Sequence, residues 1–268
     1  MGKFDGVMIF CDFDNTLTTS DKSVAKTCRE WRINPKNFEA VKRFTEEGGK
    51  FVMATGRNPD EVSPLLECMP IYDIAVCTNG TLYSFSQGKA VVDVVLADEA
   101  IDDLKDICSL SWMRNWRTTD ADFVNQGWDV GDEEDALKVL LQQKMPLHKI
   151  AFWGREDREY CEKIHRYLTE NYGKKYTVEA SFYNFFELYV KGGGKAEGVK
   201  RLAKECGAKK IICVGDMDND IEMIKLADVG VCVANGSDRV KAVADVICAS
   251  SEFGAIADVV RMLDSGEI

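Results

Sequence analysis

Two aspartates, one residue apart, directly follow a short apolar segment near the start of the chain. Asp12 and Asp14 come after Val7–Cys11, in which every residue is apolar. A short continuous apolar run of this kind predicts a strand that is buried on both faces. Carboxylates are rarely buried unless they pair with a cation or bind a metal. The spacing therefore indicates a cation site, with its associated chemistry, at the end of a core strand.

Two other predicted strands also end in residues that can bind a phosphate or a metal. Residues 51–54 lead into a Thr-Gly-Arg segment at 55–57, and residues 211–214 lead through a glycine into Asp216. Ligands of parallel α/β sheets bind beyond the carboxyl ends of the strands. We therefore expect these segments to meet Asp12 in one crevice, although they lie far apart in the sequence.

The expected crevice is rich in carboxylates. Five such groups close together cannot all stay ionised without a cation. Because the ligands offered are oxygens, with no His or Cys in these segments, the composition favours Mg²⁺. Mg²⁺ in proteins usually binds one or two carboxylates, waters and a substrate phosphate, so the site implies a phosphorylated substrate. The carboxylates are Asp12, Asp14, Asp216, Asp218 and Asp220.

The elements that must position these residues alternate between strand and helix in the first and last parts of the chain. Residues 74–77 are predicted to be a further strand of the same sheet, and this alternation predicts a Rossmann-like parallel sheet with helices on both faces. Residues 83–189 instead contain a hairpin pattern, helical patterns and strand-like segments. We expect an α/β core of residues 1–82 and 190–268, split by an inserted α+β domain at 83–189. The helical patterns of the insert lie at 99–110, 133–143 and 157–172.

Composition and charge exclude several classes of partner. The chain has 268 residues and a net charge of −11, which opposes non-specific binding to nucleic acid or anionic lipid. Its ten cysteines form no Cys-x-x-Cys pair, and many lie in apolar segments, so we expect reduced cysteines in a cytoplasmic protein. No apolar stretch approaches the roughly 18 residues that a membrane span needs. The sequence is compatible with a monomer or a small homo-oligomer.

Four segments, in this order, resemble the motifs of the haloacid dehalogenase superfamily. They are Asp-Phe-Asp-Asn-Thr at 12–16, Ala-Thr-Gly-Arg at 54–57, Lys195, and Gly-Asp-Met-Asp-Asn-Asp at 215–220. The resemblance extends over the whole predicted core. It implies a HAD-like fold and a phosphoric monoester hydrolase that uses Mg²⁺.

Further segments resemble the Cof-type branch of that superfamily, which contains sugar-phosphate phosphatases. They are the Thr-Gly-Arg segment, Cys-Thr-Asn-Gly at 77–80 and Lys-Gly-Gly-Gly-Lys-Ala at 191–196. The glycines before Lys195 depart from the Gly-Val-Ser that is more usual there. In this branch a large α/β cap (type IIB) is inserted between the second and third motifs, and the insert at 83–189 lies in that place. The resemblance implies that the insert is a cap domain that selects the substrate.

The resemblance also implies roles for individual residues. Asp12 would attack phosphorus and form an aspartyl-phosphate, and Asp14 would act as general acid and then general base. Thr55 and Lys195 would bind the phosphoryl group and complete the catalytic set. The implied metal ligands are Asp12, Asp14 through its backbone carbonyl, Asp216, and Asp220, which could instead orient a metal water or Lys195. The implied substrate-binding residues are Thr55, Gly56, Arg57, Asn79, Lys195 and Asn219.

Each of these residues also has a purely structural interpretation. An Asp or Asn after a strand is often a turn residue or a helix cap, which applies to Asp218 and Asn219. Arg57 could form only a surface ion pair, because a guanidinium binds phosphate and carboxylate equally well. Asn79 followed by glycine is a plain turn signal.

The leading hypothesis is a Mg²⁺-dependent phosphatase that acts on a small soluble phosphomonoester, such as a sugar phosphate or a related metabolite. A phosphomutase on the same core is an alternative, and release of inorganic phosphate distinguishes the two. A second alternative is a catalytically silent phosphate-binding regulatory domain. That alternative predicts the loss of Asp12, Asp14 or Lys195, and all three are present.

Overall fold

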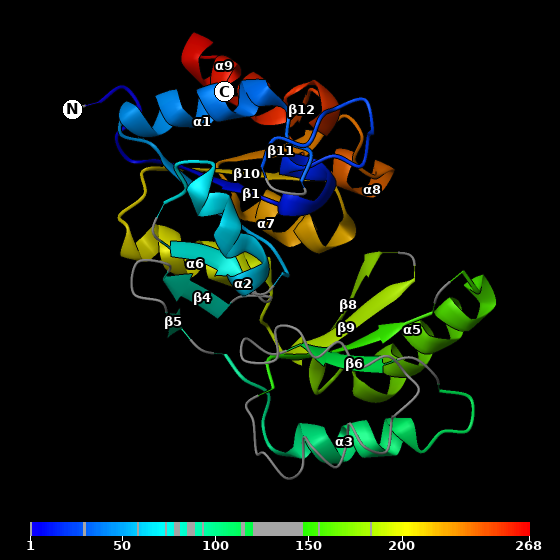
Figure 1. Ribbon diagram of the computed structural model, residues 1–268. Coiled ribbons are helices and arrows are strands. Elements are labelled where there is room, and N and C mark those ends of the chain that lie inside the picture. Colours follow the sequence, from blue (N-terminus) through cyan, green and yellow to red (C-terminus); the bar gives the residue numbers. More distant parts are fainter. Residues whose placement is uncertain are drawn as a thin grey trace. The chain divides into compact units, whose positions relative to one another are not determined.

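The chain folds into two compact units (Figure 1). The first unit contains residues 1–92 and 195–268, and the second contains residues 93–194. The helix expected at 133–143 and the candidate site residue Asn79 lie outside the described residues. This computed structural model describes residues 2–28, 31–57, 59–72, 74–77, 81–84, 89–92, 94–113, 116–119, 147–154, 156–182 and 184–268.

The described part of the first unit contains one sheet of five parallel strands, namely β1 (Val7–Cys11), β2 (Lys50–Met53), β10 (Lys210–Gly215), β11 (Val229–Val233) and β12 (Val246–Cys248). The strand order is β12-β11-β10-β1-β2. Cys11 at the end of β1 is in register with Val214 of β10 and with Met53 of β2. The carboxyl ends of these three strands therefore lie side by side, which confirms the predicted parallel α/β core.

Helices α1 (Pro35–Glu46) and α9 (Ala255–Ser265) lie on one face of this sheet, and α6 (Lys195–Glu205) and α7 (Ile221–Leu226) lie on the other (Figure 1). Ile9 and Cys11 of β1 belong to the core shared with α1 and α9. Met8 and Phe10 belong to the core shared with α6 and α7. Because successive side chains of a strand point to opposite faces, an all-apolar strand such as β1 can be buried on both.

The local sequence sets the bounds of α1. Asn34 caps its first turn by accepting the backbone N–H two residues further on at 3.0 Å, and Pro35 occupies the first helical position. Val41 and Phe44, three residues apart, lie on its buried face. Gly48 follows the helix with φ +96°, a left-handed conformation that ends helices.

The strand expected at residues 74–77 does not join the parallel sheet. As β3 (Ile74–Cys77), it pairs antiparallel with β4 (Thr81–Ser84), which in turn pairs with β5 (Lys89–Val92). A parallel crossover needs a dozen or more residues, and far fewer separate β3 from β4. The expectation of a parallel strand here was wrong. The chain leaves the first unit after residue 92 and returns at residue 195, not at the expected residues 83 and 190.

The second unit is an α+β unit with an antiparallel sheet. Its described strands are β6 (Trp116–Thr119), β7 (Lys149–Trp153), β8 (Tyr176–Phe182) and β9 (Phe185–Val190), in the order β6-β7-β9-β8. Helices α3 (Glu99–Cys108) and α5 (Arg158–Tyr172) share an apolar core with residues of this sheet. Among the described residues, no helix is both long enough and apolar enough to cross a membrane.

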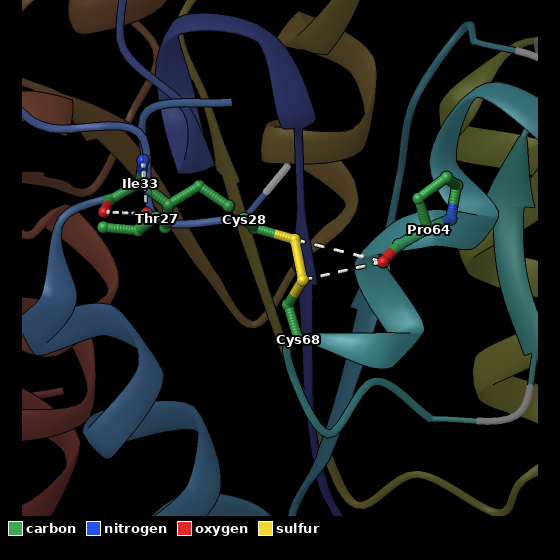
Figure 2. Close-up of a disulfide and its surroundings, with 5 residues drawn as sticks. All are labelled: Thr27, Cys28, Ile33, Pro64 and Cys68. Carbon is green, nitrogen blue, oxygen red and sulfur yellow. Dashed lines mark hydrogen bonds between the residues drawn. A yellow bond between two sulfur atoms is a disulfide. The ribbon is translucent and has the colours of Figure 1, made fainter. Parts of the chain in front are cut away.

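Cys28 and Cys68 form a disulfide within the first unit (Figure 2). Their Cα atoms are 5.9 Å apart, although 40 residues separate them in sequence. Both sulfur atoms lie near the carbonyl oxygen of Pro64, at 3.9 and 3.7 Å. The expectation that every cysteine is reduced was therefore wrong for this pair. Among the cysteines that the structure describes, the free ones are Cys11, Cys161, Cys206, Cys213, Cys232 and Cys248.

Candidate active site

The loop after β1 places Asp12 and Thr16 close to the loop after β10. The backbone N–H of Asp12 donates to Val214 of β10 at 2.9 Å, which extends the ladder one residue beyond β1. Asn15 has φ +56°, a left-handed conformation that Asn tolerates better than most residues do. Beyond this turn, the hydroxyl of Thr16 donates to Oδ1 of Asp216 at 3.1 Å.

Lys195, at the start of α6, lies between two carboxylates. Its Nζ donates to Oδ1 of Asp12 at 2.5 Å and to Oδ1 of Asp220 at 2.7 Å. Only 3% of Lys195 and 6% of Asp12 are exposed, and Asp220 is fully buried. Burial by itself lowers the pKa of Lys195, but the charges of Asp12 and Asp220 raise it overall, so the ammonium form persists. The structure thus joins three segments that are distant in sequence.

Asp220 fixes the loop that carries Asp216. Its Oδ2 accepts the backbone N–H groups of Asp216 at 2.9 Å and of Met217 at 3.2 Å, while its Oδ1 accepts Lys195. Gly215 makes room for this arrangement, because a Cβ there would lie 2.5 Å from the Asp220 carboxylate. Since both oxygens of Asp220 have protein partners, its contacts fit an orienting role for Lys195 better than direct metal ligation.

Three carboxylates offer oxygens to one small region. Asp12, Asp216 and Asp220 each have a carboxylate oxygen within 4.8 Å of those of the other two. Among the described residues, Lys195 is the only cation that bonds to these carboxylates. The formal charge of the three carboxylates and Lys195 together is therefore negative. An all-oxygen, net-negative donor set fits a hard divalent cation such as Mg²⁺.

Burial opposes charge on two of these carboxylates. It raises the pKa of Asp12 above its usual range, although Lys195 acts in the opposite direction. Burial, followed by the neighbouring charge of Asp220, raises the pKa of Asp216 to about 7. Without a bound cation, the group therefore retains a proton near neutral pH.

Arg57 pairs with the second aspartate of the first motif. Its Nε donates to Oδ2 of Asp14 at 2.8 Å, and its Nη2 donates to Oδ1 at 2.9 Å. The guanidinium also lies over the ring of Phe13, 5.2 Å from its centroid. The backbone N–H of Arg57 donates to the hydroxyl of Thr55 at 3.2 Å, so the second motif folds back on itself. In this structure the partner of Arg57 is a residue of the candidate site.

The remaining candidate residues are less closely tied to this group. Gly56 is partly exposed in the loop after β2. Asn219 is partly buried in a short 3₁₀ turn, Asp218–Asp220. The carboxylate of Asp218 pairs with Arg239.

The sequence interpretation missed a fourth strand end at the site. β11 is followed by Asn235, whose side-chain amide donates to the carbonyl oxygen of Asn15 at 2.8 Å. Ser237, two residues later, donates its backbone N–H to the carbonyl oxygen of Asp216 at 2.8 Å. The sequence does carry a signal for it, because the short, largely apolar run at 229–233 is typical of a buried strand and an Asn-Gly pair follows at 235–236.

Comparison with known proteins gives a family match over most of the chain. A family described as haloacid dehalogenase-like hydrolase matches residues 9–260. A pyridoxal phosphate phosphatase from Escherichia coli is 24% identical over 94% of this chain and 97% of its own length. A chloroplastic endoribonuclease from Arabidopsis thaliana is 26% identical over 94% of this chain. The chain spans only 45% of that relative's length.

Solved structures share the fold at low sequence identity. A haloacid dehalogenase-like hydrolase from Bacteroides thetaiotaomicron superposes with a TM-score of 0.76 and 24% identity, over 97% of this chain and 100% of that one. A sugar phosphatase of HAD subclass IIB superposes with a TM-score of 0.70 and 18% identity, over 98% of this chain and 99% of that one. At these identities the likeness concerns the fold alone.

Proposed function

Because the chain belongs to the haloacid dehalogenase-like hydrolase family, we propose that it is a Mg²⁺-dependent phosphatase that works through an aspartyl-phosphate on Asp12. The predicted superfamily, with its Cof-type branch, is confirmed, and the chain is a phosphoric monoester hydrolase. The observation that carries the proposed mechanism is the buried contact of Lys195 with Asp12, beside the carboxylate of Asp216.

Asp12 is the proposed nucleophile. One of its oxygens would form a bond to phosphorus while the bond from phosphorus to the leaving oxygen breaks. Lys195 holds Asp12 in place and supplies positive charge next to the phosphoryl group that arrives there. Thr55, which is almost fully buried at the end of β2, would offer its hydroxyl to a phosphoryl oxygen.

Asp14 is the proposed proton carrier. It would give a proton to the leaving oxygen, and the resulting carboxylate would then take a proton from the water that hydrolyses the aspartyl-phosphate. Asp14 is more exposed than Asp12, so it can reach both the alcohol and a water. Arg57 positions its carboxylate.

The residues that would hold Mg²⁺ are Asp12 and Asp216 through their side chains, with the backbone carbonyl of Asp14. When bound, the ion would reduce the repulsion between the Asp12 carboxylate and the substrate phosphate. Asp220 would orient Lys195 and the Asp216 loop, as its contacts indicate.

The proposed substrate is a small phosphorylated metabolite, such as a sugar phosphate. Named relatives support this class: the Escherichia coli protein acts on pyridoxal phosphate, and the subclass IIB structure is a sugar phosphatase. We assign substrate selection to the second unit, residues 93–194, because it is inserted between the motifs of the core. The endoribonuclease relative does not support a ribonuclease activity for this chain, because the chain spans less than half of that relative.

The test is phosphate release from a panel of phosphomonoesters in the presence of Mg²⁺. The Asp12→Asn variant should remain folded and lose at least about a thousandfold in turnover, because the nucleophile is gone. The same substitution at the partly exposed Asp21 is the matched control and should change little. After rapid acid quenching, mass spectrometry should find phosphate on the peptide that contains Asp12.

Three results would contradict the proposal. Wild-type turnover in Asp12→Asn would exclude the aspartyl-phosphate mechanism. Transfer of the phosphoryl group to another hydroxyl without release of inorganic phosphate would identify a phosphomutase. If the purified chain bound phosphate but turned over no ester, a catalytically silent domain would be the better description.

A further inference from the structure

In the turn after β11, both polar atoms of the Asn235 side chain form hydrogen bonds with backbone groups. Nδ2 of Asn235 donates to the carbonyl oxygen of Asn15 at 2.8 Å, and Oδ1 of Asn235 accepts the backbone N–H of Ser251 at 2.8 Å. One partner is an acceptor and the other is a donor, and an amide in this orientation satisfies both with separate atoms. Asn235 therefore links the loop after β1 to the segment after β12.

The carbonyl that Asn235 holds belongs to a conformationally unusual residue. Among the described residues, Asn15 is the only one other than glycine with a positive φ, +56°. Such a conformation is unfavourable for an L-residue and persists where surrounding contacts hold it. Asp14 precedes this turn and Thr16 follows it, so the peptide that Asn235 holds sets the direction of both.

The same turn contacts the second loop of the site. Ser237 donates its backbone N–H to the carbonyl oxygen of Asp216 at 2.8 Å. Gly236 allows this close approach, because a Cβ there would lie 2.5 Å from the sulfur of Cys232 and 3.2 Å from Cα of Asp216. Residues 235–237 therefore contact both the loop of Asp14, the candidate acid, and the loop of Asp216, a candidate metal ligand.

We propose that Asn235 is a positioning residue for Asp14, acting through the carbonyl of Asn15. The inference rests on the proposed phosphatase function. In the first step an oxygen of Asp12 bonds to phosphorus, and the bond between phosphorus and the leaving oxygen breaks. The electron pair of that bond remains on the leaving oxygen, which takes the proton of Asp14. Asn235 exchanges no proton and contacts no reacting atom, and it fixes the turn from which Asp14 reaches the leaving oxygen.

A leaving-group comparison tests this role. An alkoxide is a poor leaving group and needs the proton of Asp14, whereas dinitrophenolate is weakly basic and leaves without it. The value of kcat/KM reports only the steps up to release of the alcohol or phenol, so it isolates the acid role of Asp14. We would measure it with an alkyl phosphomonoester that the wild type hydrolyses and with dinitrophenyl phosphate.

Two substitutions remove the contact in different ways. Asn235→Ala removes both hydrogen bonds, and Asn235→Asp keeps an acceptor for Ser251 but places an oxygen against the carbonyl of Asn15. We expect each substitution to lower kcat/KM for the alkyl ester by about tenfold or more. For the dinitrophenyl ester, kcat/KM should change by less than about threefold. Asp14→Asn should show the same selectivity, with a larger loss for the alkyl ester.

The matched control is Asn171→Ala. Its amide also donates to a backbone carbonyl, that of Tyr167, at 2.8 Å on an exposed surface of α5. This variant should have the wild-type kcat/KM for both substrates. If Asn235→Ala proved unfolded by circular dichroism, Asn235→Asp would decide the question.

The outcomes separate this inference from the proposed function. An equal loss for both esters in the Asn235 variants would mean a general structural role and would overturn the inference while leaving the phosphatase intact. Wild-type kcat/KM for the alkyl ester in both variants would also overturn it. A wild-type protein that releases phosphate from no phosphomonoester of the panel would overturn the proposed function and this inference together.

Discussion

Arg57 holds both carboxylate oxygens of Asp14, one through its Nε at 2.8 Å and the other through its Nη2 at 2.9 Å. This two-point contact suits an ionised carboxylate, which is the form that would accept a proton from water. The acid form of Asp14 must carry its proton on one of the two oxygens that Arg57 now contacts. Protonation of either oxygen would weaken the hydrogen bond that this oxygen accepts from Arg57.

Arg57→Lys tests whether this geometry matters beyond its charge. Lysine keeps the positive charge but cannot make the parallel pair of hydrogen bonds, so Asp14 would be held less firmly. We expect kcat/KM for an alkyl phosphomonoester to fall about tenfold. Arg43→Lys, at a partly exposed pair with Asp264, should have no effect. Unchanged kinetics for Arg57→Lys would show that charge alone is sufficient.

Lys195→Met tests the buried charge pair. The substitution leaves Asp12 and Asp220 buried without their common partner, and breaking a buried ion pair from one side typically destabilises by about 3–5 kcal/mol. Urea unfolding should show this loss. The double variant with Asp12→Asn should recover part of it, because one of the two stranded carboxylates is then removed.

The control for this prediction is Lys225→Met, since Lys225 pairs with Glu222 on the surface. It should alter stability little. A Lys195→Met protein as stable as the wild type would mean that the two carboxylates take up protons when the lysine is absent.

The raised pKa of Asp216 predicts a pH-dependent affinity for Mg²⁺. Without the ion, Asp216 holds a proton below its pKa of about 7. That proton must leave before the carboxylate can bind a cation. The affinity should therefore fall as the pH drops below about 7 and level off above it. Calorimetric titration with Mg²⁺ across this range would measure the effect, with proton release visible in buffers of different ionisation enthalpy.

Asp216→Asn is the control for the pH experiment. It should bind Mg²⁺ more weakly at every pH and lose most of the pH dependence. Equal affinity of the wild type well below and well above neutral pH would contradict the assignment of Asp216 as a ligand.

The disulfide predicts a measurable contribution to stability. Replacing Cys28 and Cys68 together by serine should lower the free energy of unfolding by about 2–4 kcal/mol, because the unfolded chain regains the freedom that the cross-link removes. A reductant should destabilise the wild type similarly and leave the double variant unchanged. Cys206→Ser, at a free cysteine, is the control. A wild type insensitive to reductant would contradict the prediction.

Much of the core was predictable because burial leaves a clear sequence pattern. β1 is apolar at every position, and the strand-end rule alone predicts that Asp12 and Asp216 share one crevice, as they do in the structure. The same rule applied to β11 would have included Asn235. The antiparallel pairing of β3 was missed because strand periodicity alone does not give strand direction.

Other contacts depend on distances that only the fold sets. The sequence could not decide between phosphate and carboxylate as the partner of Arg57, since a guanidinium binds both in the same geometry. Nothing near Cys28 indicates Cys68, because pairing requires their Cα atoms to lie within about 7 Å, and the two cysteines are 40 positions apart in the sequence.

The Cys28–Cys68 bond also makes a closed covalent ring of the chain between these residues. α1, β2 and the Thr-Gly-Arg loop lie on this ring, whereas Asp12 and Asp14 lie outside it. A protease that cut the ring once would leave two fragments that migrate as one band until a reductant is added. After a cut between Cys28 and Arg57, the two motifs that meet at Asp14 and Arg57 would stay tethered under oxidising conditions, and under reducing conditions only packing would hold them together.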